Sequence, residues 1–83
     1  MGSLGRYRKK IDGIDRRIIG LLRSRFEAAK KISDFKKINK IRIADKKREL
    51  EVLGSIKKYS KNHREFLTVI FRKIIGYSKK LQK

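Results

Sequence analysis

The feature that most constrains this chain is an apolar stripe that runs through its amino-terminal half. At steps of three and four residues the stripe is formed by Leu4, Arg8, Ile11, Ile14, Ile18, Leu21, Arg25, Ala28, Ile32 and Phe35. This spacing is typical of one face of a long helix that packs against other helices. Because the sequence contains no proline, we expect a single uninterrupted helix from about Ser3, a possible N-cap, to about Ile38.

The expected length of this helix bears on how the chain covers its apolar surface. A helix of more than thirty residues is about 50 Å long, and the rest of the chain is too short to cover it. The 83 residues include no cysteine, so disulfides cannot compensate for a small core. We therefore expect residues 1–83 to form one helical domain that pairs with a second copy of itself.

Two shorter elements follow the long helix. The apolar pattern breaks from Lys36 to Ala44, which we interpret as the connection, with a short extended piece possible where Ile41 and Ile43 alternate with polar residues. Asp45 has the character of an N-cap, which predicts a second helix from Lys46 to about Tyr59.

A third helix is predicted after a turn at residues 60–62. Asn62 and Glu65 have the spacing of a capping box. The helical stripe beyond them consists of Phe66, Leu67, Ile70, Phe71, Ile74, Ile75, Ser78, Leu81 and Gln82. The predicted fold is all-α, with a long, a short and a medium helix.

The composition is strongly basic, with 26 Lys and Arg against 8 Asp and Glu and a formal net charge of +18. A basic helical domain is a common footprint of nucleic-acid binding. A positive field also concentrates a small anionic substrate, and a lysine-rich surface can simply keep a protein solvated. Charge alone does not separate these three interpretations.

Two arginines interrupt the apolar stripe of the first helix. Arg8 and Arg25 lie 17 residues apart, about 25 Å along a helix axis, so one small molecule cannot contact both on one helix. Each could extend to water at the edge of the stripe. If two copies pack antiparallel, Arg8 of one comes level with Arg25 of the other, and two equivalent sites form. Lys36 lies eleven residues beyond Arg25, on nearly the same face.

Polar residues also interrupt the other two stripes. Glu49 opens the stripe of the second helix, where a carboxylate is also favoured by the helix dipole alone. Ser78 and Gln82 are one turn apart on the third helix, where fraying into solvent is the simpler interpretation of each. Taken together with the cations, these groups predict a pocket for a small dianion. The sequence has neither a catalytic triad nor metal-ligand spacing, and its single histidine, His63, falls in a predicted turn.

The order of these residues resembles the all-helical class of chorismate mutases. The resemblance covers nearly the whole chain and rests on Arg8, Ile11-Asp12-Gly13-Ile14-Asp15, Leu21-Leu22-Arg23-Ser24-Arg25, Lys36, Asp45-Lys46-Lys47-Arg48-Glu49 with Val52-Leu53, and Ile74-Ile75-Gly76-Tyr77-Ser78 with Leu81-Gln82. It implies an intertwined homodimer with two active sites. By the same analogy, Arg25 of one chain and Arg8 of its partner bind the two substrate carboxylates, assisted by Ser78 and Arg48.

The resemblance also implies the rest of the site and the reaction. Glu49, with the backbone near Asp45, would hold the substrate hydroxyl, while Lys36 and Gln82 would donate hydrogen bonds to the ether oxygen. The reaction would be the rearrangement of chorismate to prephenate in phenylalanine and tyrosine biosynthesis, the shikimate pathway, without cofactor or metal. Because terminal helix turns fray, we expect Gln82 to be loosely held unless the partner chain or the substrate orders it.

Two other functions remain open on the sequence. A related pericyclic lyase acting on isochorismate would use a similar cationic pocket, although Glu49 and Ser78 favour the mutase. A basic module that binds nucleic acid would need its cations on one exposed face, whereas here they are spread over all three predicted helices. No apolar run is long enough to span a membrane, so we expect no membrane partner and a cytoplasmic protein.

Overall fold

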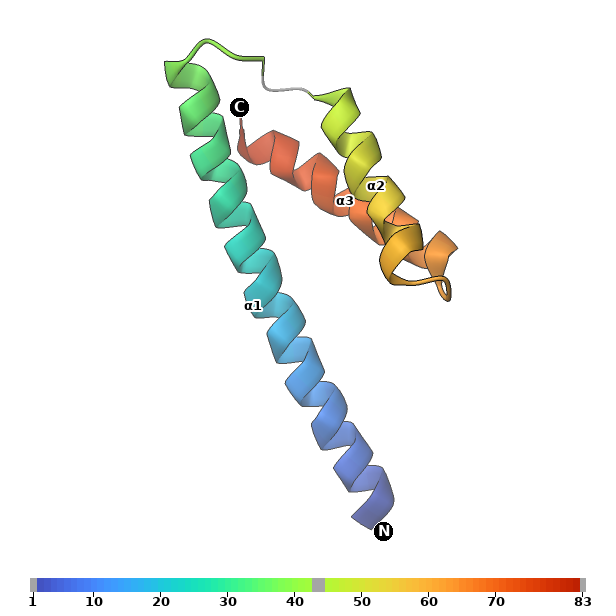
Figure 1. Cartoon of the computed structure of the whole chain (residues 1–83). Helices are drawn as coiled ribbons and strands as arrows, with labels where there is room; N and C mark the ends of the chain where they lie inside the picture. Colours follow the sequence, from blue (N-terminus) through green and yellow to red (C-terminus); the bar gives the residue numbers. More distant parts are fainter. Residues whose placement is uncertain (1, 43–44, 83) are drawn as a thin grey trace.

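A computed structural model describes residues 2–42 and 45–82. In these two ranges the chain forms three α-helices and no strand: α1 (Gly2–Ile38), α2 (Lys46–Tyr59) and α3 (Arg64–Leu81) (Figure 1). The predicted all-helical fold is thus confirmed, with one long, one short and one medium helix. None of the described helices is long and apolar enough to cross a membrane.

The connection after α1 is shorter than predicted, because the break in the apolar pattern indicated that it begins at Lys36, whereas α1 continues to Ile38. Lys36 still belongs to the last turn of α1, where its carbonyl accepts a 2.7 Å hydrogen bond from the Ile41 backbone N–H. Lys40 then adopts a left-handed conformation, with φ of 57°, which ends the helix. Ile41 and Arg42 belong to no strand, and Ile43 of the expected extended piece lies outside the described residues.

Local hydrogen bonds explain where the other two helices begin. The Asp45 carboxylate accepts a 3.0 Å hydrogen bond from the Arg48 backbone N–H, which confirms Asp45 as the N-cap of α2. The capping box predicted from Asn62 is wrong. The residue before α3 is His63, in a left-handed conformation with φ of 62° and without a side-chain cap, while the Asn62 carbonyl accepts a bond from the Ser60 hydroxyl within the turn.

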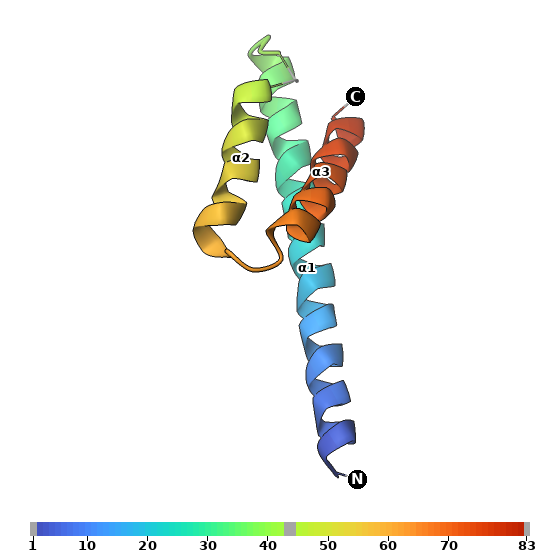
Figure 2. The ribbon, with the colours of Figure 1, turned by 90° about the vertical axis from the view of Figure 1, so that its right-hand side faces the viewer.

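The small core lies where α3 packs against both α2 and the carboxyl-terminal half of α1. Its buried apolar residues are Ala29, Ile56 and Ile75, one from each helix. Phe26 and Tyr77 extend the contact between α1 and α3 with an edge-to-face ring pair whose centroids are 4.8 Å apart. These contacts hold one half of α1 beside the other two helices and leave its other half without a neighbour in the described chain (Figures 1 and 2).

The chain is therefore far more extended than a compact monomer. Its accessible surface is 7666 Å², against about 5,200 Å² for a globular protein of this mass. Its radius of gyration is 16.3 Å, against about 12 Å for a compact domain of this length. The unsupported half of α1 exposes Leu4, Tyr7, Ile11, Ile14, Ile18 and Leu21. These six residues, here called the α1 seam, alternate at steps of three and four, the repeat by which helices pair in coiled coils.

Candidate active site

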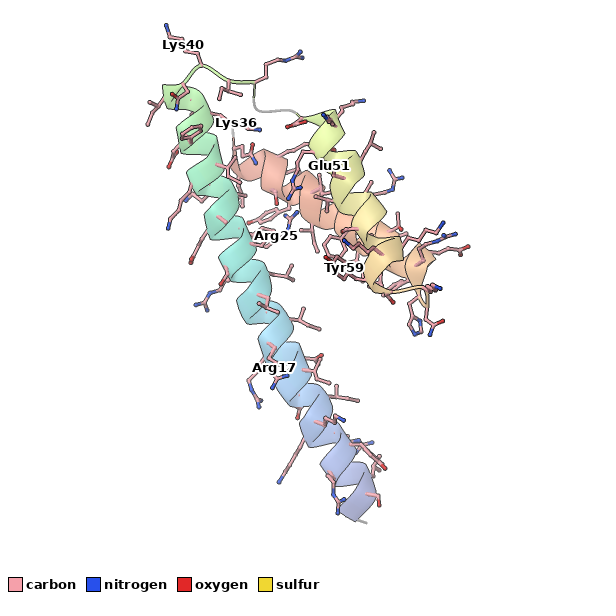
Figure 3. The ribbon with its side chains drawn as sticks, in the orientation of Figure 1. Arg17, Arg25, Lys36, Lys40, Glu51 and Tyr59 are labelled. Carbon is pink, nitrogen blue, oxygen red and sulfur yellow. The ribbon has the colours of Figure 1, made fainter. Side chains whose placement is uncertain are left out.

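A pocket of about 260 Å³ opens between the three helices at the carboxyl-terminal half of α1. It is lined by Arg25, Ala28, Ala29, Ile32, Lys36, Asp45, Arg48, Glu49, Val52, Ile75, Ser78, Lys79 and Gln82. Figure 3 shows Arg25 and Lys36 reaching from α1 into the space beside α3. Of the eight site residues predicted from the sequence, the structure brings seven to this pocket, and Arg8 is the exception.

Arg25 is held at the pocket by a hydrogen bond across two helices. Its guanidinium donates to the Ser78 hydroxyl over 3.0 Å, and that hydroxyl donates in turn to the Ile74 carbonyl over 2.9 Å. Ser78 is only 6% exposed, so this bond lies at the base of the pocket. Arg25 therefore turns toward α3 and does not extend to bulk water, and its remaining N–H groups can bind an anion.

Glu49 forms an ion pair that the sequence analysis did not identify. Its Oε1 lies 2.9 Å from the Lys79 ammonium, whereas its Oε2 is buried and has no hydrogen-bond partner within the described part of the chain. A buried acceptor without a donor is costly in a folded protein, so this oxygen is available to accept a hydrogen bond from a group that enters the pocket. Lys79 could have been found from its spacing, because it follows the buried Ile75 by one helical turn.

The amino-terminal end of α2 supplies a further cation, Arg48, to the pocket lining. The Nη1 of Arg48 lies 3.6 Å from the Oε1 of Glu51 on the same helix. The side chains of this ion pair are 70% and 55% exposed. An exposed pair of this kind contributes little to stability and is readily exchanged for another partner. The Arg48 guanidinium is consequently able to turn from Glu51 toward an anion in the pocket.

Gln82 lines the same pocket as Lys36, from the carboxyl-terminal end of α3. It is the C-cap residue of α3, and its backbone N–H donates to the Lys79 carbonyl over 3.1 Å. Its own carbonyl accepts a 3.1 Å hydrogen bond from the hydroxyl of Ser33 on α1. The sequence led us to expect a loosely held residue unless another molecule ordered it, but this bond ties Gln82 to a helix of its own chain. Its side-chain Oε1 is buried without a partner among the described residues.

Arg8 lies in the unsupported half of α1, where its side chain is exposed. The distance to Arg25 along the helix is about 25 Å, so Arg8 is remote from the pocket of its own chain. It follows Tyr7 of the α1 seam directly in the sequence.

The chemistry available in the pocket is electrostatic. Four cations line it, Arg25, Lys36, Arg48 and Lys79, against the two carboxylates of Asp45 and Glu49. Such a lining can grip a small dianion, orient it between fixed donors, and stabilise negative charge that develops during a reaction. Apolar side chains on all three helices complete the wall and suit the carbon skeleton of a small organic ligand.

Comparison with known proteins identifies the family. The sequence profile described as chorismate mutase type II matches residues 7–83. The chain belongs to this family. It is also 36% identical over 84 residues to a chorismate mutase of Methanocaldococcus jannaschii, an alignment that covers 98% of this chain and 85% of the relative. No solved structure matches the chain significantly. The resemblance to the chorismate mutases drawn from the sequence is thus confirmed, and the chain is an enzyme of the isomerase class.

Proposed function

We propose that this protein rearranges chorismate to prephenate, a step of phenylalanine and tyrosine biosynthesis. The observation that carries the proposal is the convergence of Arg25, Lys36, Glu49 and Gln82 from three helices on one cationic pocket in a member of the chorismate mutase family. With the exception of Arg8, the residues that would contact the dianion all line one pocket of a single chain.

In this proposal, cationic side chains bind the substrate carboxylates, and the first turn of α2 binds the substrate hydroxyl. Arg25 and Arg8 of the partner subunit bind the two carboxylates, and Ser78 and Arg48 assist them. The buried Oε2 of Glu49 accepts a hydrogen bond from the substrate hydroxyl, which supplies the donor that this atom lacks in the described chain. The ion pair with Lys79 orients the Glu49 carboxylate for this contact.

Catalysis in this proposal follows from the nature of the reaction. The rearrangement is unimolecular and pericyclic, so the protein must select the compact conformer of the substrate and stabilise charge on the ether oxygen as its bond breaks. Lys36 and Gln82 act as the two donors to that oxygen. A donor directed at developing charge contributes about 3 kcal/mol to lowering the barrier. This scheme assigns no step to a cofactor or a metal.

The proposed active assembly is an intertwined homodimer. The α1 seam supports this, because it exposes an apolar face with coiled-coil spacing that the chain itself does not cover. The excess surface relative to a compact monomer is about 2,500 Å² per chain, or about 5,000 Å² for two chains, which lies in the range that obligate dimers bury in total. Antiparallel packing of two seams would bring Arg8 of the partner subunit level with Arg25.

Replacement of Ile14 by aspartate should separate the proposed dimer. Ile14 lies at the centre of the α1 seam, so the variant would bury an unpaired charge at the interface, and we expect association to weaken at least about thousandfold. Sedimentation velocity would report the change in mass, together with loss of activity. Ile38→Asp is the matched control, because Ile38 is 80% exposed at the other end of α1 and should tolerate the charge. A monomeric wild-type protein that is fully active would contradict the dimer.

The decisive test of the function is turnover of chorismate by purified protein that has been dialysed against a chelator. We expect prephenate to form at a rate far above the spontaneous one, with no added cofactor. Parallel assays with isochorismate, read as pyruvate release, and with duplex DNA, read as salt-sensitive binding, cover the two alternative functions. If chorismate is not consumed while either alternative assay is positive, the proposed function is incorrect.

A further inference from the structure

Among the described residues, Ser33 is more deeply buried than Ser78, the other buried polar side chain: only 2% of its surface is exposed, and it does not line the pocket. Its hydroxyl donates a 3.1 Å hydrogen bond to the backbone carbonyl of Gln82, which lies 49 residues further along the chain. This buried hydroxyl therefore adds a second hydrogen bond between α1 and α3, at the end of α3, to the one that Arg25 donates to Ser78.

The acceptor of this bond is a group that a helix cannot satisfy by itself. Gln82 is the C-cap residue of α3, and the last carbonyls of a helix have no N–H donor within the helix. Such ends fray unless a side chain or another element supplies the donor. Ser33 supplies it from α1, so the terminal turn of α3 is fastened to a second helix.

The side chain of Gln82 gains its position from this backbone tie. Its Oε1 is buried and has no hydrogen-bond partner in the described ranges, so no bond to this oxygen helps to orient the amide. Ser33 is also three residues before Lys36, one turn away on the same helix. One turn of α1 therefore carries Lys36, one of the two proposed donors to the ether oxygen. Through Ser33, the same turn also holds Gln82, which supplies the other donor.

We propose that Ser33 is a positioning residue for catalysis, which sets the distance between the Gln82 amide and the Lys36 ammonium. This inference rests on the proposed function, because it assigns Ser33 a role through Gln82 in the same rearrangement. Two donors stabilise one oxygen together only if their separation is held, and a displacement of about 1 Å at a catalytic group can cost a hundredfold in rate. Ser33 does not touch the substrate.

The test is the kinetics of Ser33→Ala with chorismate. We expect kcat to fall about tenfold while KM changes by less than about twofold, because the carboxylate-binding groups are untouched. Ser33→Cys, which keeps the approximate size but is a weak donor, should show the same loss and excludes an effect of the small cavity. Ser55→Ala is the matched control, because the Ser55 hydroxyl also donates to a backbone carbonyl, that of Val52 over 2.6 Å, but Ser55 does not line the pocket and its bond stays within α2.

A double-mutant cycle distinguishes positioning from a general loss of stability. In the Gln82→Ala background, Ser33→Ala should have no further effect on kcat, because the group that it positions is gone. An unchanged kcat in Ser33→Ala, or an equal loss in the Gln82→Ala background, would overturn the inference. Either result would leave the proposed function standing as long as the wild-type protein converts chorismate. A wild-type protein without turnover would instead reject the proposed function itself.

Discussion

Replacing Lys36 by alanine should lower kcat on chorismate about a hundredfold or more while leaving the helical content unchanged. Lys36 lines the pocket from the last turn of α1, and in the proposed site its ammonium group faces the ether oxygen. Negative charge grows on that oxygen only as the bond breaks, so the loss should appear in kcat and in kcat/KM together. Steady-state kinetics and far-ultraviolet circular dichroism give the two measurements.

The neighbouring Lys37 provides the control for this substitution. Lys37 has the same side chain and lies in the same helical turn, but it is exposed and does not line the pocket. Lys37→Ala should therefore retain nearly full activity. Equal losses in the two variants would attribute the effect to the general positive field of the chain and remove Lys36 from its proposed role.

A mixture of two inactive variants should recover activity if the sites are shared between chains. In a dimer of one Arg8→Ala chain and one Lys36→Ala chain, one pocket has Lys36 together with an intact Arg8 of the partner subunit. The other pocket carries both defects. Random assortment makes half of the dimers mixed, so the mixture should reach about a quarter of the wild-type activity. The measurement is chorismate turnover after the chains are denatured together and refolded.

The structure also provides a matched control for this recovery. Lys36 and Gln82 line the same pocket of one chain, so a mixed dimer of Lys36→Ala and Gln82→Ala has one defect in each site. This second mixture should stay inactive. Recovery in both mixtures, or in neither, would contradict a site completed by Arg8 of the partner subunit.

Much of the fold could be predicted because its signals are local. The apolar spacing of α1 and the N-cap at Asp45 placed the ends of α1 and α2 within a residue of their observed positions. Helical spacing also put Arg25, Lys36 and Ser78 on inward faces, and the structure brings them to one pocket. Periodicity is reliable here because each helix presents a single apolar stripe to its neighbours.

Features that depend on tertiary contacts could not be predicted in the same way. The capping box predicted for α3 is wrong because the spacing of Asn62 and Glu65 fits one, whereas the residue before the helix is the left-handed His63, without a side-chain cap. The ion pair of Lys79 with Glu49 and the tie from Ser33 to Gln82 each join different helices. Nothing in the spacing of Ser33 marks it as different from a serine on the surface.

The unsupported half of α1 has a consequence for how the protein reaches its native state. Most of the stability of a helix in a protein comes from tertiary packing of its apolar face, and Gly13 and Gly20 each weaken this helix by about 1 kcal/mol relative to alanine. In the proposed dimer, the ordering of this segment thus becomes part of association rather than a step that precedes it. Recovery from denaturant would then be second order in chain concentration, and the encounter of two chains would itself be a folding event.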